Sequence, residues 1–143
     1  MNVRQISVFL ENAAGRLADA CDLLGKNGIN MRALSLADAS DFGVLRMIVN
    51  DTDAALRLLK EHAYAAAATE VIAVEVPDTP GGLASILRLL RGEGVNIEYM
   101  YAFVEKKAAA AVVVIRVEAV DRAAGALGAA NVRMLTEADV AML

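Results

Sequence analysis

Cysteine, tryptophan, proline and charged residues are all scarce in this chain of 143 residues. Cys21 is the only cysteine, so no disulfide can form within the chain, and we expect a cytoplasmic protein. The longest strongly apolar run, 108–115, is far shorter than the roughly 20 residues that a membrane-spanning helix needs. The start at Met1 also lacks the apolar core of a signal peptide. We therefore predict neither a membrane span nor secretion.

Charge and reactive side chains exclude several functions. The net charge of -4 repels phosphate backbones, which argues against a nucleic-acid partner. His62 is the only histidine and belongs to a predicted helix end, and Cys21 has no histidine partner. Since no cluster has metal-ligand spacing, we predict no metal, no cofactor and no catalysis. Hydrophobic residues make up 57% of the chain, which indicates buried contact between units and between chains.

One sequence pattern occurs twice. A glycine-containing loop, a helix-patterned stretch and a Gly-x-Asn turn fill residues 12–31 and return, without a gap, in residues 78–97. Gly81 accordingly lies 66 positions after Gly15. Such a repeat predicts two similar units in which a loop leads into a helix.

The two units are predicted to span residues 1–70 and 71–143, each with the order strand, helix, strand, strand, helix, strand. Alternating apolar residues predict the strands, and apolar residues at i, i+3, i+4 and i+7 predict the first helix of each unit. The predicted strands are 5–10, 31–36, 43–49 and 65–70, then 71–76, 97–103, 109–117 and 132–136. The predicted helix stripes are Leu17, Ala20, Cys21 and Leu24, then Leu83, Ile86, Leu87 and Leu90.

This order predicts an α+β fold, a ferredoxin-like βαββαβ sandwich duplicated in tandem. Thr52 or Asp53 is expected to cap the second helix and Asp121 to open its counterpart, about two residues later in the repeat. Helices on one face of each sheet leave the other face bare. We expect that face, or a sheet edge, to pair side by side with another unit, because its residues are too apolar for water: Phe9, Met47, Val49 and Ala73.

The second copy of the repeat resembles the ACT domain, a small regulatory module with this order of elements. The resemblance rests on the loop Asp78-Thr79-Pro80-Gly81-Gly82-Leu83, the leucine-rich helix after it, and Gly94-Val95-Asn96-Ile97. The first copy is similar but has Ala14 in place of the loop proline. The likeness covers nearly the whole chain, so the protein is similar to stand-alone tandem ACT proteins.

The resemblance implies that a small ligand, usually an amino acid, binds at an interface between ACT units. Family ligands contact the loop before the first helix and the start of the second strand. The matching positions here are Asn12, Ala13, Ala14, Gly15, Arg16, Leu17, Asn30 and Met31, and in the second copy Asp78, Thr79, Pro80, Gly81, Gly82, Leu83, Asn96 and Ile97.

Chemistry supports these loops as amino-acid sites. The first N–H groups of a helix lack intrahelical partners and favour an anion such as a carboxylate. Asp78 offers a full charge to an ammonium where Asn12 offers an amide oxygen, which predicts stronger binding by the second copy. Alternatively, the loop merely turns the chain and Asp78 or Thr79 caps the helix.

We therefore predict a non-catalytic, amino-acid-binding regulatory protein that forms a homodimer and acts on a regulated enzyme. The alternative is a ligand-free module for oligomerisation or partner docking. Tyr99, Tyr101 and Phe103 alternate along one strand and are expected to pack an interface rather than line a pocket. A third class is an acylphosphatase-like hydrolase using Arg4 or Arg16, but neither arginine lies in a phosphate-cradling pattern.

Overall fold

The structure, a computed structural model, describes residues 3–11, 14–38, 41–104 and 110–142. None of the helices in these ranges has the length and apolar character required to span a membrane. In chain order the elements are β1 (Val3–Glu11), α1 (Arg16–Lys26), β2 (Met31–Asp38), β3 (Phe42–Val49), α2 (Thr52–Glu61), β4 (Ala65–Pro77), α3 (Gly82–Gly92), β5 (Ile97–Ala102), β6 (Ala110–Val117), α4 (Val120–Ala129), β7 (Met134–Leu135) and α5 (Glu137–Ala141).

The strands form one curled sheet in the order β2-β3-β1-β4-β6-β5, with β7 paired to β4. The start of β4, from Ala65 to Val71, pairs with β1 and completes a first ferredoxin-like unit. The rest of β4 pairs with β6 and β7 and opens a second unit. The tandem ferredoxin-like fold is confirmed. The last strand of one unit and the first strand of the next are a single strand, however, because no turn residue interrupts residues 65–77.

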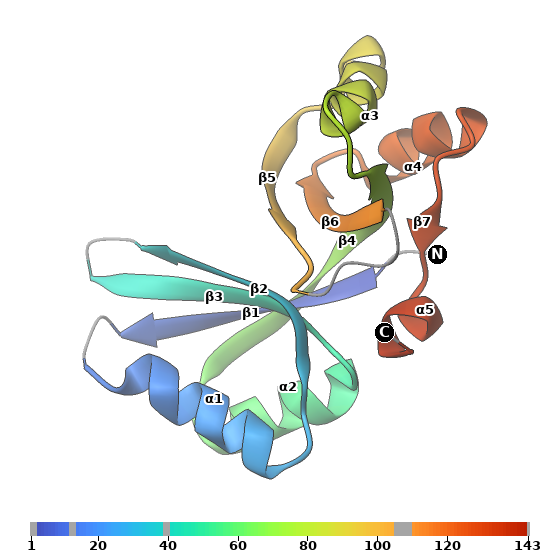
Figure 1. Ribbon diagram of the computed structural model, residues 1–143. Helices are drawn as coiled ribbons and strands as arrows, with labels where there is room; N and C mark the ends of the chain where they lie inside the picture. The colour runs from blue at the N-terminus through green and yellow to red at the C-terminus, as the bar shows by residue number, and fades with distance from the viewer. Residues whose placement is uncertain (1–2, 12–13, 39–40, 105–109, 143) are drawn as a thin grey trace.

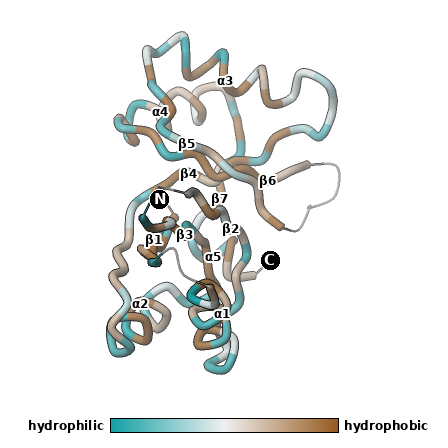
Figure 2. Tube along the Cα trace, turned by 90° about the vertical axis from the view of Figure 1, so that its left-hand side faces the viewer, coloured by the Kyte–Doolittle hydropathy of each residue, from teal (hydrophilic) through white to brown (hydrophobic). Residues whose placement is uncertain are grey.

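Each unit packs its helices on one face of its part of the sheet. In Figure 1, α1 and α2 lie below the sheet and α3 and α4 lie above it, and Figure 2 shows the same separation from the side. Two buried apolar clusters result, one under each helix pair. Burying such a cluster contributes about 25 cal/mol per Å² of apolar surface, which is the main term that stabilises units this small.

The helix stripes differ from the predicted ones in the same way in both units. Ala20, Leu24, Ile86 and Leu90 are buried as expected. Leu17 is 38% exposed and Leu83 is 36% exposed. Leu23 and Leu89 pack against the cores beside the buried positions. Helical periodicity predicts which side of a helix is apolar, but it does not determine which residues at the margins of that side are buried against the sheet.

The helix-free faces of the two units pack against each other. Val3, Ile48, Val71, Ala73, Val112 and Val114 belong to this third cluster, together with Phe103 and the partly buried Tyr101. The edges of β2 and β5 meet there, where Val104 N–H donates to the Arg32 carbonyl at 3.0 Å and Ala33 bridges to Phe103. The expectation of an aromatic interface is thus confirmed.

The prediction of which residues lie on the helix-free face of the sheet is partly wrong. Ala73 lies in the cluster between the units, but Met47 and Val49 are buried under the helices of the first unit. Phe9 does point away from the helices, yet it remains 48% exposed beside Phe42. Met47 pairs with Ile6, so strand register rather than composition decides which face each side chain takes.

The N-terminal caps of α2 and α4, the second helix of each unit, also differ from expectation. Asp51, and neither Thr52 nor Asp53, caps α2 by accepting from Ala54 N–H at 3.1 Å. Ala119 precedes α4 without a capping side chain, and Asp121 lies in the first turn. The strands β3 and β6 stand 68 positions apart, whereas β2 and β5 stand 66 apart, so the two extra residues fall before β6.

The C-terminal helix α5 was not predicted. Thr136 accepts from Asp139 N–H at 3.1 Å, and the Asp139 carboxylate accepts from Thr136 N–H at 2.9 Å, which is a capping box. This cap ends β7 after two residues, where the sequence predicted a strand over 132–136.

Candidate functional site

The two glycine loops have the same backbone conformation. Gly15 and Gly81 are the N-caps of α1 and α3, both left-handed, with φ of 86° and 84°. This conformation favours glycine, because a Cβ would approach the following carbonyl oxygen. The alternative interpretation, in which Asp78 or Thr79 is the N-cap of α3, is wrong, because Gly81 takes that position and no capping side-chain hydrogen bond is formed there among the described residues.

The loops are accessible and suited to an anion. Ala14, Gly15, Asp78, Thr79, Pro80 and Gly81 are all exposed. Leu17 and Leu83 extend the exposed surface one residue into each helix start. A helix that begins without a capping side chain keeps N–H donors and the positive end of its dipole at that point. Asn12 and Ala13, two predicted site residues, lie outside the described residues.

Gly82 and Arg16 occupy equivalent positions in very different surroundings. A Cβ placed on Gly82 would lie 2.0 Å from the Pro77 carbonyl oxygen, so packing within the second unit requires glycine there. In the first unit, the Arg16 guanidinium carbon lies 5.2 Å from the centre of the Tyr64 ring. Its Nε is buried and has no hydrogen-bond partner within the part of the chain that the structure describes. The two loops are therefore not chemically equivalent.

The predicted asparagines lie far from the loops of their own units. Asn30 follows α1, whose eleven residues place it about 16 Å from the helix start. Asn30 N–H donates to Asn50 Oδ1 at 2.9 Å, and Asn50 N–H donates back to the Asn30 carbonyl at 3.2 Å. The backbone of Asn30 thus stabilises a turn. The side chains of Asn30 and Asn96 are exposed, and Met31 and Ile97 are half-buried.

The fold also keeps the two loops apart within one chain. One loop leads into α1 below the sheet and the other into α3 above it (Figure 1). A site that combines a loop with an asparagine turn therefore needs a neighbouring unit that the chain itself does not place there.

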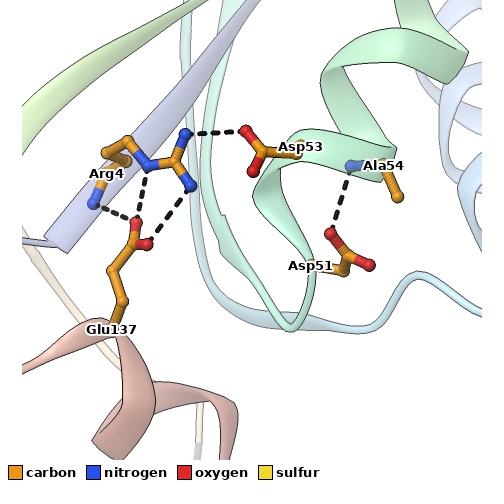
Figure 3. A network of polar contacts seen from close by, with 5 residues as sticks. All are labelled: Arg4, Asp51, Asp53, Ala54 and Glu137. Atoms are coloured by element: carbon orange, nitrogen blue, oxygen red, sulfur yellow. Dashed lines mark hydrogen bonds and ion pairs between the residues drawn. The ribbon is translucent and has the colours of Figure 1, made fainter.

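A polar cavity of about 290 Å³ lies where β1, α2 and α5 meet, and Arg4 lines it. Figure 3 shows the Arg4 side chain between Glu137 and Asp53. Its Nε lies 2.9 Å from Glu137 Oε1, and its NH1 nitrogen lies 2.8 Å from Asp53 Oδ1. Arg4 hydrogen bonding lowers the pKa of Asp53 below its ordinary value.

Arg4 is therefore a link between the units and not a free substrate-binding cation. Its two carboxylate partners lie 49 and 133 residues away along the sequence, so no local pattern pairs them. Sequence analysis gave Glu137 no role for that reason.

A second polar contact missed by the sequence lies between the helix-free faces of the two units. Gln5 is fully buried, donates to the Tyr99 hydroxyl at 2.6 Å and accepts from the Tyr101 hydroxyl at 2.6 Å. Arg46 stacks over the Tyr99 ring at 3.9 Å. These contacts fix the orientation of the two units, because a buried amide must keep its partners.

The remaining reactive residues have structural surroundings. His62 Nδ1 contacts the Leu58 carbonyl at 3.0 Å at the end of α2. Cys21 is half-buried, and burial raises the pKa of its thiol. Among residues 3–11, 14–38, 41–104 and 110–142, no group of three histidine, cysteine, aspartate or glutamate side chains is placed to hold a metal ion.

Solved structures with this fold include one that is close in sequence. Protein BT0572 from Bacteroides thetaiotaomicron is 41% identical over 100% of this chain and 98% of its own, with a TM-score of 0.93. The ligand-free regulatory subunit of aspartate kinase from Thermus thermophilus is 20% identical over 91% of this chain and 93% of its own, with a TM-score of 0.63. Its counterpart from Thermus flavus is 19% identical over 92% of this chain and 94% of its own, with a TM-score of 0.60.

No curated protein matches the sequence. The family described as ACT domain pair matches residues 1–143, the whole length of the chain. The two units of the chain, each with a left-handed glycine before its first helix, agree with a pair of similar domains. The chain belongs to the ACT domain pair family.

Proposed function

We propose that the protein is a non-catalytic regulatory protein that binds a free amino acid at its glycine loops. The observation that carries the proposal is the repeated loop geometry: both units keep a left-handed glycine before an uncapped helix, with an exposed leucine beside it. Membership of the ACT domain pair family supports it. So does the shared fold with regulatory subunits of aspartate kinase.

In the proposed site, the helix start receives the carboxylate of the amino acid. At α3 the Gly82 N–H already donates to the Thr79 carbonyl at 3.0 Å, so the later N–H groups of the first turn supply the donors, and the helix dipole favours the negative charge. Asp78, exposed in the second loop, supplies the acceptor for the ammonium group. The second unit is therefore the stronger binder, because the first loop has Asn12 at the matching position.

A second copy of the chain completes the first-unit site in this proposal. Strand β2 is an edge of the sheet, and its Leu34 and Leu36 are 43% and 51% exposed. Exposed leucines on an edge strand are typical of a surface that pairs with another chain. A two-fold axis beside β2 reverses the direction of the partner, so the start of α1 in one chain meets the asparagine turn of the other.

We also propose that ligand binding shifts the packing of the paired chains, and that a regulated enzyme in the cytoplasm responds to this shift. A ligand moves such an equilibrium only by its difference in affinity for the two arrangements. A ligand held between chains has that difference, because separating the chains removes half of its contacts.

Isothermal titration calorimetry with the twenty amino acids tests the proposal. We expect heat for one amino acid or a small chemical group of them. Asp78→Ala should weaken binding more than Asn12→Ala, and equal losses would contradict the assigned role of Asp78. Absence of heat with all twenty amino acids would favour a ligand-free docking module. A melting temperature that no amino acid raises would lead to the same conclusion.

A further inference from the structure

The second unit contains an apolar groove beside the start of α3, and Gly82 is the one predicted glycine-loop residue among those that line it. The groove encloses about 720 Å³ between α3, the end of α4 and the edge of β4. Ile86, Leu89 and Val132 supply its apolar lining, and Glu75 and Arg133 are the charged residues beside it. Its volume lies within the roughly 300–1,000 Å³ of small-molecule sites.

The groove forms because the short strand β7 covers only part of the edge of β4. β7 pairs with β4 at Ala73 and Val74 only, and Glu75 N–H then donates to the Arg133 carbonyl at 2.9 Å. Beyond that point the edge of β4 reaches Pro77, which has no N–H and so discourages an added strand. The free edge therefore suits a small molecule better than an extended peptide.

The first unit can be aligned with the second to find which of its residues correspond to the groove. Left-handed residues mark equivalent points in both units, with Gly15 matching Gly81 at the helix starts and Ala63 matching Asn131 after the second helices. The contacts agree, because Tyr64 N–H donates to Leu59 and Val132 N–H donates to Leu127. By this correspondence, Arg16 matches Gly82 and Tyr64 matches Val132.

In the first unit two side chains occupy the equivalent position. The Tyr64 ring packs against the apolar core, and the Arg16 guanidinium stacks on that ring at 5.2 Å. Arg16 Nε is buried in this arrangement, and the Arg16 and Tyr64 residues are half-buried. The second unit has glycine and valine instead, so the ring and the cation are both missing and the groove takes their place.

We propose that this groove binds a small molecule with a planar apolar ring and a carboxylate. The ring takes the position that the Tyr64 ring has in the first unit and packs on Ile86, Leu89 and Val132. The Arg133 side chain is 52% exposed and lies 3.5 Å from Glu75 Oε1 and 3.8 Å from Asp139 Oδ1. These separations exceed the roughly 2.8 Å of a good charged hydrogen bond, so the guanidinium has donors to offer to a carboxylate.

Two ligand types share this chemistry and can be told apart. An aromatic carboxylic acid uses Arg133 alone, whereas an aromatic amino acid also places its ammonium beside Glu75. Phenylpropionate and L-phenylalanine differ in that ammonium and are the probes. Propionate, which keeps the carboxylate but lacks the ring, is the control ligand.

The test follows the methyl signals of Ile86, Leu89 and Val132 by NMR in the full chain. We expect saturable shifts with phenylpropionate or L-phenylalanine below about 10 mM and none with propionate. Val132→Tyr introduces the first-unit residue and should weaken binding at least about tenfold by filling the groove. Ala84→Tyr places the same side chain at an exposed position of α3 outside the lining residues and should bind as the original protein does.

A second variant keeps the proposal falsifiable if Val132→Tyr does not fold. Arg133→Gln should weaken phenylpropionate at least about threefold by removing the guanidinium charge. Absence of shifts at the three groove methyls with both aromatic probes would overturn the proposal, and so would equal affinity in the original protein and Val132→Tyr. Asp78 does not line the groove, so Asp78→Ala should leave the groove shifts intact even where it abolishes binding at the glycine loop.

Discussion

Gly82→Ala tests the packing that places the second glycine loop. The added Cβ would lie 2.0 Å from the Pro77 carbonyl oxygen and 3.0 Å from its carbonyl carbon. An ordinary contact needs more than 1 Å of extra separation, and both partners are backbone, so no side chain can rotate away. Overpacking of this kind costs typically 1–3 kcal/mol, and we expect about 3 kcal/mol here because backbone must move.

Urea unfolding followed by circular dichroism measures this loss directly, and a melting curve should fall by about 9 °C at roughly 3 °C per kcal/mol. Gly92→Ala is the matched control, since a Cβ there meets nothing within 4 Å and Gly92 ends the same helix. The free energy of unfolding of Gly92→Ala should stay unchanged or rise by up to about 1 kcal/mol. A Gly82→Ala variant as stable as Gly92→Ala would refute the close approach of α3 to Pro77.

Two further predictions concern the Gln5–Tyr101 contact between the units and the Arg4–Asp53 ion pair within the first unit. Tyr101→Phe removes the donor to the buried Gln5 Oε1 and should lower the free energy of unfolding by about 1–3 kcal/mol, measured in urea; an unchanged value would show that Gln5 finds another donor. Arg4 lowers the pKa of Asp53 in the folded state, so this carboxylate adds stability above its ordinary pKa of about 3.9 and loses that contribution as the pH falls. In Asp53→Asn, the urea midpoint should therefore decline less steeply below about pH 4 than in the original protein. The same decline in both proteins would contradict the stabilising role of the Asp53 carboxylate.

The repeat made the fold predictable. Gly15 and Gly81 occupy matching positions of the repeat, and an apolar helix stripe follows each, which identified two units and their order of strands and helices. The left-handed φ at both positions explains why glycine recurs there. The fusion of two predicted strands into β4 was not predictable from alternation alone. Residues 65–77 contain no turn residue before Pro77, and only pairing with β1 and then with β6 distinguishes the two halves of β4.

Contacts between distant residues account for most of what sequence analysis missed. Arg4 and Glu137 are 133 positions apart, and Gln5 and Tyr101 are 96 apart, so no local pattern pairs them. Conversely, Arg16 and Gly82 differ at one aligned position, yet their different surroundings emerge only when Tyr64 and Pro77 are placed beside them.

A crystal structure of the protein grown with a mixture of amino acids tests the central proposal most directly. We expect density for an amino acid at the start of α3, with its carboxylate toward the first-turn N–H groups and its ammonium toward Asp78. Loops covered by neighbouring side chains in both units, with no ligand beside Gly15 or Gly81, would contradict it.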